Sequence, residues 1–493
     1  MKSLTMLACA AGMFWAGVAG AITIEGIESM QVVQVDAGGT AVVALSGKAT
    51  GARAEVLVEN TRRSGIVAGW EALGDISGGK YSGELRLQEG GPYRVSVRSV
   101  DASGAQAELA EVSGVLAGDL WVLAGQSNMQ GVGNLDEHVL DPHPLVNVLR
   151  MNHEWALAAE PLHILGESPD PVHGKFDSEQ QRVGNVRASY EGTKGATLGM
   201  AFAQSMVEAT GRPVGLVATA HGGTSLEQWN PAYKDKGGDS LYGSMLAQVK
   251  KAGGKVRGVL WYQGESDANP KDAPTYGDRF KTLILSMRED FGGAEMPFYY
   301  VQIGRFVNPG VDAANWNKLR AEQLRVEADI APGAMVGSID LDLDDAIHIG
   351  TPGLNMLGQR MALLAQRDLF GTGSDIGPRF SSMETFSTPY ERGVRVNFTH
   401  VNDALAAAGR LGGFEFTDGP EGPVVECIYK QDIDPQNPTS VRLFVQLLPA
   451  NAQLWYGRGE NPYCNLSDKR GHGLPTFGPM PVPQELLDEY VRK

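Results

Sequence analysis

The chain has 493 residues, of which 42% are hydrophobic and 20% are charged, and its formal net charge is −16. This length predicts two to four domains and a substantial core. The acidic balance argues against nucleic acid and against anionic membranes as partners, because both carry negative charge.

The first 21 residues are typical of a signal peptide. Lys2 is followed by a mostly apolar run over 4–18, and the small residues 19–21 fit a cleavage site before Ile22. The run is short for a membrane anchor, and it is too short before Cys9 to suit lipid attachment. We therefore expect a secreted or periplasmic protein, whose mature chain has a net charge of 41 − 58 = −17.

Residues 22–116 predict an N-terminal β-sandwich-like domain. Short alternating stretches at 31–36, 54–59 and 93–100 are separated by Gly-rich turns, a pattern that is typical of small β domains. No cluster of catalytic residue types lies in this part of the sequence.

Residues 117–372 alternate buried strands with amphipathic helices, which predicts a parallel sheet covered by helices on both faces. Ligands bind such sheets at the C-terminal ends of the strands. The predicted strands are 120–124, 214–220, 256–263, 298–303 and 335–339, and the predicted helices are 198–209, 240–251, 276–291, 315–328 and 354–369.

A polar segment over 134–193, strand-like only at 145–151, interrupts this alternation. We expect so long an insertion to shape the substrate cleft. From 373 to 493 the chain is β-rich again, with alternating stretches at 394–398 and 441–447. A C-terminal β domain is therefore predicted.

Two cysteines, Cys427 and Cys464, remain after cleavage of the signal peptide. In an exported chain they favour a disulfide, and two buried free thiols are the alternative. The sequence has no C-x-x-C or H-E-x-x-H pattern and only nine His. We therefore expect neither a metal nor another cofactor.

Ser127 is the candidate nucleophile. It follows the apolar strand 120–124 and stands in the segment GQSNM at 125–129. The exit of a buried strand is where hydrolases place such a serine, because the rigid strand leaves the hydroxyl exposed beside free N–H groups. The alternative is a serine that caps a helix.

His348 is the candidate base for this serine, and Asp345 stands three residues before it. At that spacing a carboxylate can reach the Nδ1 atom of the histidine and fix its tautomer. The alternatives are an acidic loop with an incidental histidine, or a cation site. The carboxylates of such a site would be Asp340, Asp342, Asp344 and Asp345.

Two further segments offer donors for an oxyanion. The turn at 221–225 contains Gly222 and Gly223, whose backbone N–H groups can approach a bound oxygen closely. Gln263 ends the strand 256–263, and its side-chain amide can donate a hydrogen bond. An ordinary glycine turn and a structural glutamine are the alternatives.

Taken in order, the segments at 125–129, 222–224, 261–266 and 345–348 resemble the sequence blocks of the SGNH hydrolases. More closely, the chain resembles the sialate O-acetylesterase group and related carbohydrate acetylesterases. The resemblance covers roughly residues 85–480, including the segment 118–121, a helix over 316–323 and the tail over 456–477.

The resemblance implies a three-layer αβα, flavodoxin-like core that hydrolyses esters without a metal. It assigns Ser127 as nucleophile, His348 as general acid and base, and Asp345 as the orienting acid. It assigns the oxyanion hole to the N–H groups of Ser127 and Gly223 and the amide of Gln263, where many SGNH enzymes have Asn. Three residues are candidates for contacting substrate or supporting the site: Glu265, Trp229 and Arg320.

These observations predict an exported O-acetylesterase that acts on a glycan such as sialic acid or a plant polysaccharide. One alternative is a carbohydrate-binding protein with a decayed hydrolase core, which the intact set of site residues argues against. The other is a lipolytic SGNH esterase, for which the segment 134–193 is too polar. The acetylated carbohydrate is the expected partner, and the sequence does not specify an oligomeric state.

Overall fold

The computed structural model describes residues 22–62, 65–66, 69–174, 178–308, 310 and 312–490. The predicted signal peptide lies outside the described residues. Within them the chain forms two compact units: the first contains 22–28, 42–86 and 93–113, and the second contains 29–41, 87–92 and the chain from 114 onward. Among the helices described here, none is long and apolar enough to cross a membrane.

The first unit is built from antiparallel strands. In it, β3 (Arg53–Asn60) pairs with β4 (Gly65–Ile66), β5 (Glu71–Asp75) and β7 (Gly90–Val100). A second pair joins β2 (Thr40–Lys48) to β6 (Lys80–Gln88). Alternate side chains of these strands are buried, as the period-two pattern of the sequence predicts.

The second unit contains a sheet with the strand order β11-β10-β13-β8-β14-β15-β16. All neighbours in it are parallel except β10 and β11, which are antiparallel. The strands are β8 (Gln106–Gly125), β10 (Val146–Leu149), β11 (Trp155–Leu157), β13 (Val214–Ala218), β14 (Gly258–Tyr262), β15 (Phe298–Val301) and β16 (Gly333–Val336).

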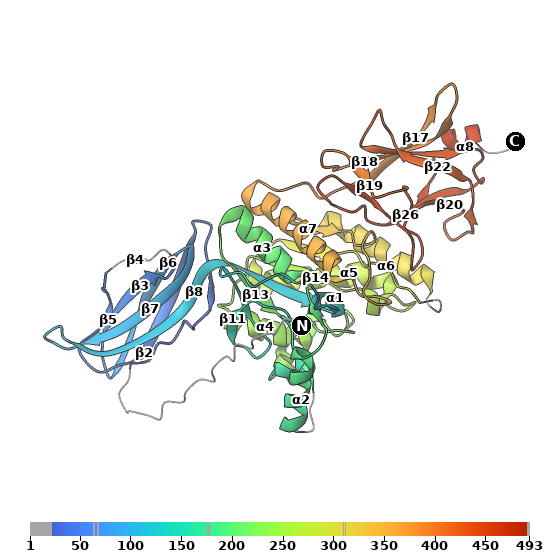
Figure 1. The fold of residues 1–493 in the computed structure, drawn as a ribbon. Coiled ribbons are helices and arrows are strands. Elements are labelled where there is room, and N and C mark those ends of the chain that lie inside the picture. The colour runs from blue at the N-terminus through green and yellow to red at the C-terminus, as the bar shows by residue number, and fades with distance from the viewer. Residues whose placement is uncertain are drawn as a thin grey trace, which may run out of the picture. The chain divides into compact units, whose positions relative to one another are not determined.

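Helices cover both faces of this sheet, with α3 and α7 packed against each other (Figure 1). The predicted α/β fold with three layers is therefore confirmed. The helices are α3 (Gly199–Thr210), α4 (Leu241–Lys251), α5 (Tyr276–Met287), α6 (Ala313–Val326) and α7 (Thr351–Phe370).

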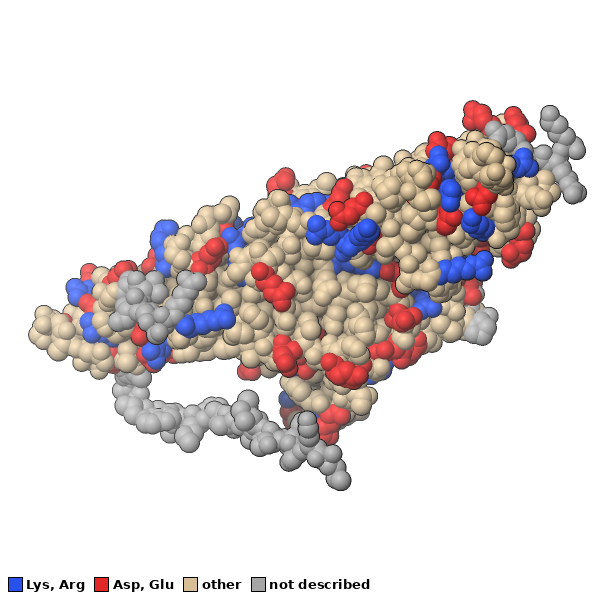
Figure 2. All heavy atoms as spheres, turned by 45° about the horizontal axis from the view of Figure 1, so that its top comes forward, with Lys and Arg blue, Asp and Glu red and all other residues tan. Residues whose placement is uncertain are grey.

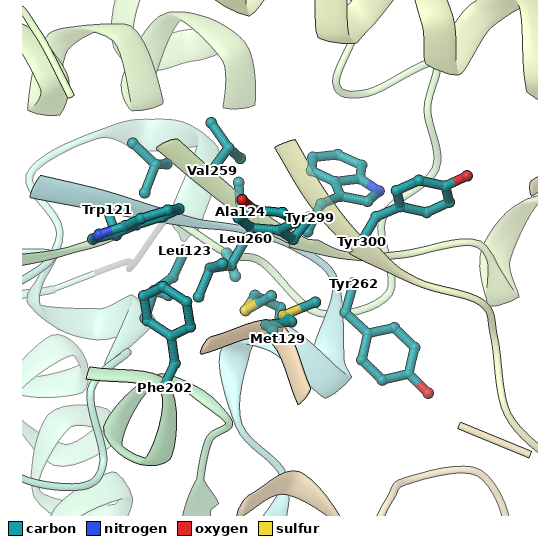
Figure 3. Close-up of a cluster of buried hydrophobic side chains, with 14 of the residues drawn as sticks. Trp121, Leu123, Ala124, Met129, Phe202, Val259, Leu260, Tyr262, Tyr299 and Tyr300 are labelled. Atoms are coloured by element: carbon teal, nitrogen blue, oxygen red, sulfur yellow. The ribbon is translucent and has the colours of Figure 1, made fainter. Parts of the chain in front are cut away.

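The core of the sheet fixes β8, the strand that leads to Ser127. Trp121 of β8 packs against Phe202 of α3 and Tyr299 of β15, with ring centroids 4.7 and 6.0 Å away (Figure 3). All three side chains are fully buried. Burial of such a side chain contributes about 1.5–3 kcal/mol, so the end of β8 is held rigidly.

The pattern at 31–36, expected in the N-terminal domain, forms β1 (Val32–Gln34). It pairs in parallel with residues 116–118 of β8, in the second unit. The strand-like stretch at 145–151 forms β10, a member of the central sheet. The rest of the insertion contains the pair β9 (Gly133–Asn134) and β12 (Lys194–Ala196), and α2 (Glu179–Tyr190).

The C-terminal region is β-rich, as the sequence predicts. One sheet has the order β17-β18-β23-β22 and another has the order β21-β20-β24-β26. The strands are β17 (Arg379–Ser387), β18 (Arg392–Thr399), β20 (Phe414–Asp418), β21 (Val424–Val425), β22 (Ile428–Ile433), β23 (Ser440–Val445), β24 (Ala452–Tyr456) and β26 (Phe477–Pro481). The short strands β19 (Leu405–Ala407) and β25 (Leu466–Asp468) pair, and α8 (Gln484–Tyr490) follows.

The predicted disulfide between Cys427 and Cys464 is wrong, because both thiols are free. Cys427 stands between β21 and β22, beside the sheet in which Ile428 pairs with β23. Cys464 is buried and packs against glycines next to Tyr456 of β24, in the other sheet. Burial raises the pKa of Cys464 to about 12, so this thiol stays protonated.

Acidic and basic side chains are interspersed on the face shown in Figure 2. Over the whole chain, 58 Asp and Glu residues exceed 42 Lys and Arg residues. Such mixing supports solubility without one dominant field.

Candidate active site

Ser127 stands at the first position of α1 (Ser127–Gln130), and only Gln126 separates it from the C-terminal end of β8. Gly125 allows this exit, because its φ is +134° and a Cβ atom there would lie 2.2 Å from the Tyr262 carbonyl oxygen. The Gln126 N–H donates to the same carbonyl at 2.8 Å. The close approach of β8 and β14 thus turns the chain and leaves Ser127 partly exposed.

The structure brings Ser127, His348 and Asp345 together. The His348 Nε2 atom lies 2.9 Å from Ser127 Oγ, and its Nδ1 atom lies 2.8 and 3.0 Å from the two Asp345 carboxylate oxygens. The His348 side chain is 20% exposed. With Nδ1 donating to the carboxylate, Nε2 is free to accept the proton of the serine hydroxyl.

Asp345 is held as a carboxylate. Burial alone would raise its pKa, but the N–H groups of Ile347 and His348 and the His348 ring lower it to about 2. Both N–H groups donate to Oδ1 at 2.9 Å. Because the pKa is lowered, the charge is present at every pH well above 2.

Asp344, the neighbouring acid, makes different contacts. Its Oδ2 atom accepts the Asn134 N–H at 2.7 Å, and its own N–H donates to the His348 carbonyl oxygen. Asp340 pairs with Arg360 of α7. The alternative of a cation site formed by this acidic loop therefore finds no support in these contacts.

Backbone donors lie beside the serine. A Cβ atom on Gly222 would lie 3.4 Å from Ser127 Cβ, so the glycine turn after β13 packs directly on the nucleophile. The Gly222 N–H donates to Gln130 Oε1 at 2.7 Å. The N–H groups of Ser127 and Gly223 have no hydrogen-bond partner among the described residues, and Gly223 opens to free space.

The assignment of the Gln263 amide to the oxyanion hole requires correction. Gln263 is fully buried, and its Nε2 atom donates to the Thr224 carbonyl oxygen at 3.0 Å and to Asp267 Oδ2 at 2.6 Å. Its Oε1 atom accepts from the Tyr276 hydroxyl at 3.1 Å. Both amide hydrogens of Gln263 are used in these hydrogen bonds. The side chain therefore stabilises the glycine turn and has no hydrogen left to donate to a substrate.

Three side chains around Ser127 connect the segments of the site, in addition to the residues predicted from the sequence. Asn128 donates to Glu265 Oε1 at 2.9 Å and accepts from the Ile349 N–H at 3.0 Å. Gln126 Oε1 accepts from the Ser266 N–H at 3.3 Å, and Gln130 accepts from Gly222. In the sequence, the polar residues on both sides of Ser127 are the signal for this role, because each one forms a hydrogen bond with another segment of the site.

Glu265, Trp229 and Arg320 take supporting positions. Burial raises the pKa of Glu265, whose Oε2 atom is buried without a partner among the described residues. Trp229 is fully buried, packs edge-on against Trp261 and donates to Thr224 Oγ1 at 2.9 Å. A sugar cannot stack on it.

Arg320 is also buried, and its guanidinium donates to the carbonyl oxygens of Ile303, Gly304 and Gly459. It therefore joins α6 to the C-terminal region. Among the described residues, one group of three side chains could hold a metal ion: Asp136, Glu137 and His138, all exposed. None of them belongs to the cluster around Ser127.

Comparison with known proteins identifies a family. A family model described as "Carbohydrate esterase, sialic acid-specific acetylesterase" matches residues 117–367. A probable carbohydrate esterase of Arabidopsis thaliana is 32% identical over 205 residues, which are 37% of this chain and 68% of the plant protein. The human sialate O-acetylesterase is 26% identical over 228 residues, which are 42% of this chain and 41% of the human protein.

The fold is shared with a carbohydrate acetylesterase from Xanthomonas citri. That crystal structure has a TM-score of 0.61 and 21% sequence identity, and the match covers 93% of this chain and 99% of the other. At this identity the likeness shows the fold. The chain therefore belongs to the family of carbohydrate esterases and sialic acid-specific acetylesterases, and it is a carboxylic ester hydrolase with an α/β core.

Proposed function

We propose that this protein is an exported carbohydrate O-acetylesterase that works through an acetyl-serine intermediate. The observation that carries the proposal is the line of contacts from Asp345 through His348 to Ser127, with distances of 2.8 and 2.9 Å. Beside it lie two backbone N–H groups, those of Ser127 and Gly223, that have no hydrogen-bond partner within the described part of the chain. This is the geometry that nucleophilic acyl transfer requires.

The reaction follows from the contacts. Ser127 Oγ attacks the acetyl carbonyl carbon while His348 Nε2 takes the hydroxyl proton. The N–H groups of Ser127 and Gly223 stabilise the oxyanion. The sugar oxygen then leaves with the proton from His348, and water hydrolyses the acetyl-serine by the same steps in reverse.

The proposed substrate is an O-acetylated glycan, either a sialic acid or a plant polysaccharide. Acetate release should be measured from O-acetylated sialic acids, acetylated xylan and acetylated xyloglucan, with 4-nitrophenyl acetate and octanoate beside them. Release from a glycan and preference for the acetate support the proposal. Preference for the octanoate would favour a lipolytic enzyme. If no ester is hydrolysed, the alternative of a carbohydrate-binding protein with a decayed hydrolase core would be favoured.

Export rests on the sequence of residues 1–21 alone. The protein should be recovered from outside the cells of a culture that expresses it, and mass spectrometry should show a chain that begins at Ile22. Recovery of the full-length chain from the cell interior only would contradict export, without affecting the proposed chemistry.

Asp345→Asn is expected to lower kcat by on the order of 10⁴-fold, because the amide no longer fixes the His348 tautomer. Asp344→Asn is the matched control, since that carboxylate accepts the Asn134 N–H and does not touch the imidazole. Steady-state kinetics on 4-nitrophenyl acetate measure both. A large loss in Asp344→Asn with little loss in Asp345→Asn would assign the orienting role to Asp344.

A further inference from the structure

A second line of polar side chains lies next to the candidate active site and ends at His221. It begins at Asp170, whose Oδ2 atom accepts the Ser244 hydroxyl at 2.5 Å. Ser244 Oγ lies 3.0 Å from His173 Nε2, and His173 Nδ1 lies 3.1 Å from His221 Nδ1. The two imidazole rings are stacked with centroids 5.2 Å apart. None of these residues has a part in the reaction proposed above.

The hydrogen bonds in this line run in one direction. Asp170 is a carboxylate, because its contact with His153 holds its pKa below the ordinary value, so it only accepts. The Ser244 hydroxyl therefore donates to it, and Ser244 Oγ in turn accepts the N–H of His173 Nε2. Burial lowers the pKa of His173 to about 3, so this ring is neutral and has no second N–H.

The direction of the chain fixes the tautomer of His221. Because His173 Nδ1 has no hydrogen, it accepts, and His221 Nδ1–H must donate to it. Burial also lowers the pKa of His221, which favours its neutral form. A neutral imidazole with its hydrogen on Nδ1 carries a lone pair on Nε2, so Nε2 is an acceptor.

His221 stands at the edge of the site. Its N–H donates to the Gly125 carbonyl oxygen at 3.0 Å, and the next residue, Gly222, packs on Ser127. The His221 side chain is partly exposed. Its Nε2 atom has no hydrogen-bond partner among the described residues, and it is not buried. An oriented acceptor is thus open to solvent on the residue that precedes the glycine turn packed on Ser127.

We propose that His221 is a substrate-binding residue whose Nε2 atom accepts a hydrogen bond from a hydroxyl group of the sugar that carries the acetyl ester. The proposal rests on the proposed function, and it adds a reason for preferring sugars with a free hydroxyl near the ester. A fixed lone pair favours a hydroxyl donor and gains nothing from an ether or an aryl leaving group. Ser244 and Asp170 then act as positioning residues.

The test compares pairs of substrates. Monoacetylated methyl glycosides of xylose and of N-acetylneuraminic acid are used with their other hydroxyls free and with them methylated, beside 4-nitrophenyl acetate. Wild type is expected to prefer the free-hydroxyl substrate in kcat/KM by about 10-fold, the value of one good hydrogen bond. His221→Phe should lose this preference, which is read as the ratio of the two kcat/KM values within the variant.

The outcomes separate the two proposals. If wild type hydrolyses none of these esters, the proposed function fails. If wild type is active but shows no preference for free hydroxyls, or if His221→Phe keeps the preference, the inference about His221 is overturned. The proposed esterase function is not affected by either result. His143→Phe, a change at a histidine that lies in the insertion and outside this line, is the control that should keep the preference.

The tautomer has its own readout. Proton–nitrogen correlation spectra of histidine-labelled protein distinguish Nδ1–H from Nε2–H, and the His221 signals are those lost in His221→Phe. We expect Nδ1–H in wild type and a shift toward a mixture in Ser244→Ala, which removes the acceptor of His173 without touching substrate. Nε2–H in the wild type would overturn the inference.

Discussion

Replacing Ser127 with alanine is expected to lower kcat/KM for every ester substrate by on the order of 10⁶-fold, with the fold retained. The substitution removes one oxygen atom from a partly exposed site, and the supporting contacts of Gln126, Asn128 and Gln130 do not involve that oxygen. Because Met129 and the end of β8 stay packed, the melting temperature should change little. Acetate release and thermal unfolding measure the two quantities.

A serine-reactive fluorophosphonate adds an independent readout for Ser127. Wild type should be labelled at this residue and Ser127→Ala should not be. Ser189→Ala, a change on the exposed helix α2, is the control that should keep both labelling and activity. Activity of Ser127→Ala at the wild-type level would show that another group performs the attack.

Periodicity predicts most of the elements over 117–372. The five strands and five helices predicted there all exist, and most of their ends shift by only a few residues. The helix expected over 276–291 shows where local pattern fails, because its α-helical part ends at Met287 and a π-helical turn covers Arg288–Gly292. The two glycines at 292–293 end the element, and the apolar spacing before them does not reveal the change in pitch.

Elements without a buried face could not be predicted in the same way. Helix α2 buries none of its residues, so no apolar stripe marks it in the sequence. The alternating pattern at 31–36 predicts strand β1 but not its partner, which is residues 116–118 of β8. Pairing over more than 80 residues is a tertiary property.

The site shows the same division between what a pattern predicts and what packing decides. Strand ends predict that residues 127, 223 and 348 meet at one edge of the sheet, because parallel strands end on the same side. The failure at Gln263 concerns the direction of one side chain. The residue does end a strand, but Asp267 and Thr224 lie beneath it and bind its amide. That choice depends on residues up to 39 positions away.

The line that ends at His221 could not be read from the sequence either. Its members come from η2 (Pro171–His173), from α4 and from the turn after β13, which share no local pattern. A histidine before two glycines looks like part of a turn. Only the contact with His173 shows that one nitrogen is engaged and the other is open.

Replacing His348 with alanine is expected to lower kcat/KM by on the order of 10⁶-fold, because Ser127 then has neither a base for attack nor an acid for the leaving sugar oxygen. The loss should nearly equal that in Ser127→Ala, since the two groups act as a unit. His138→Ala is the matched control: this histidine also pairs with a nearby aspartate, Asp136, at 3.1 Å, but it touches no serine. Steady-state kinetics on 4-nitrophenyl acetate measure all three variants.

The pH profile distinguishes the role of His348 from that of its carboxylate. Only a neutral imidazole can accept the hydroxyl proton of Ser127. A loss of wild-type activity in acid cannot come from Asp345, because its lowered pKa of about 2 keeps it ionised. The residual activity of His348→Ala should not show the acid loss of the wild type. The same acid loss in His348→Ala, or activity near the wild-type level, would mean that a different base serves Ser127.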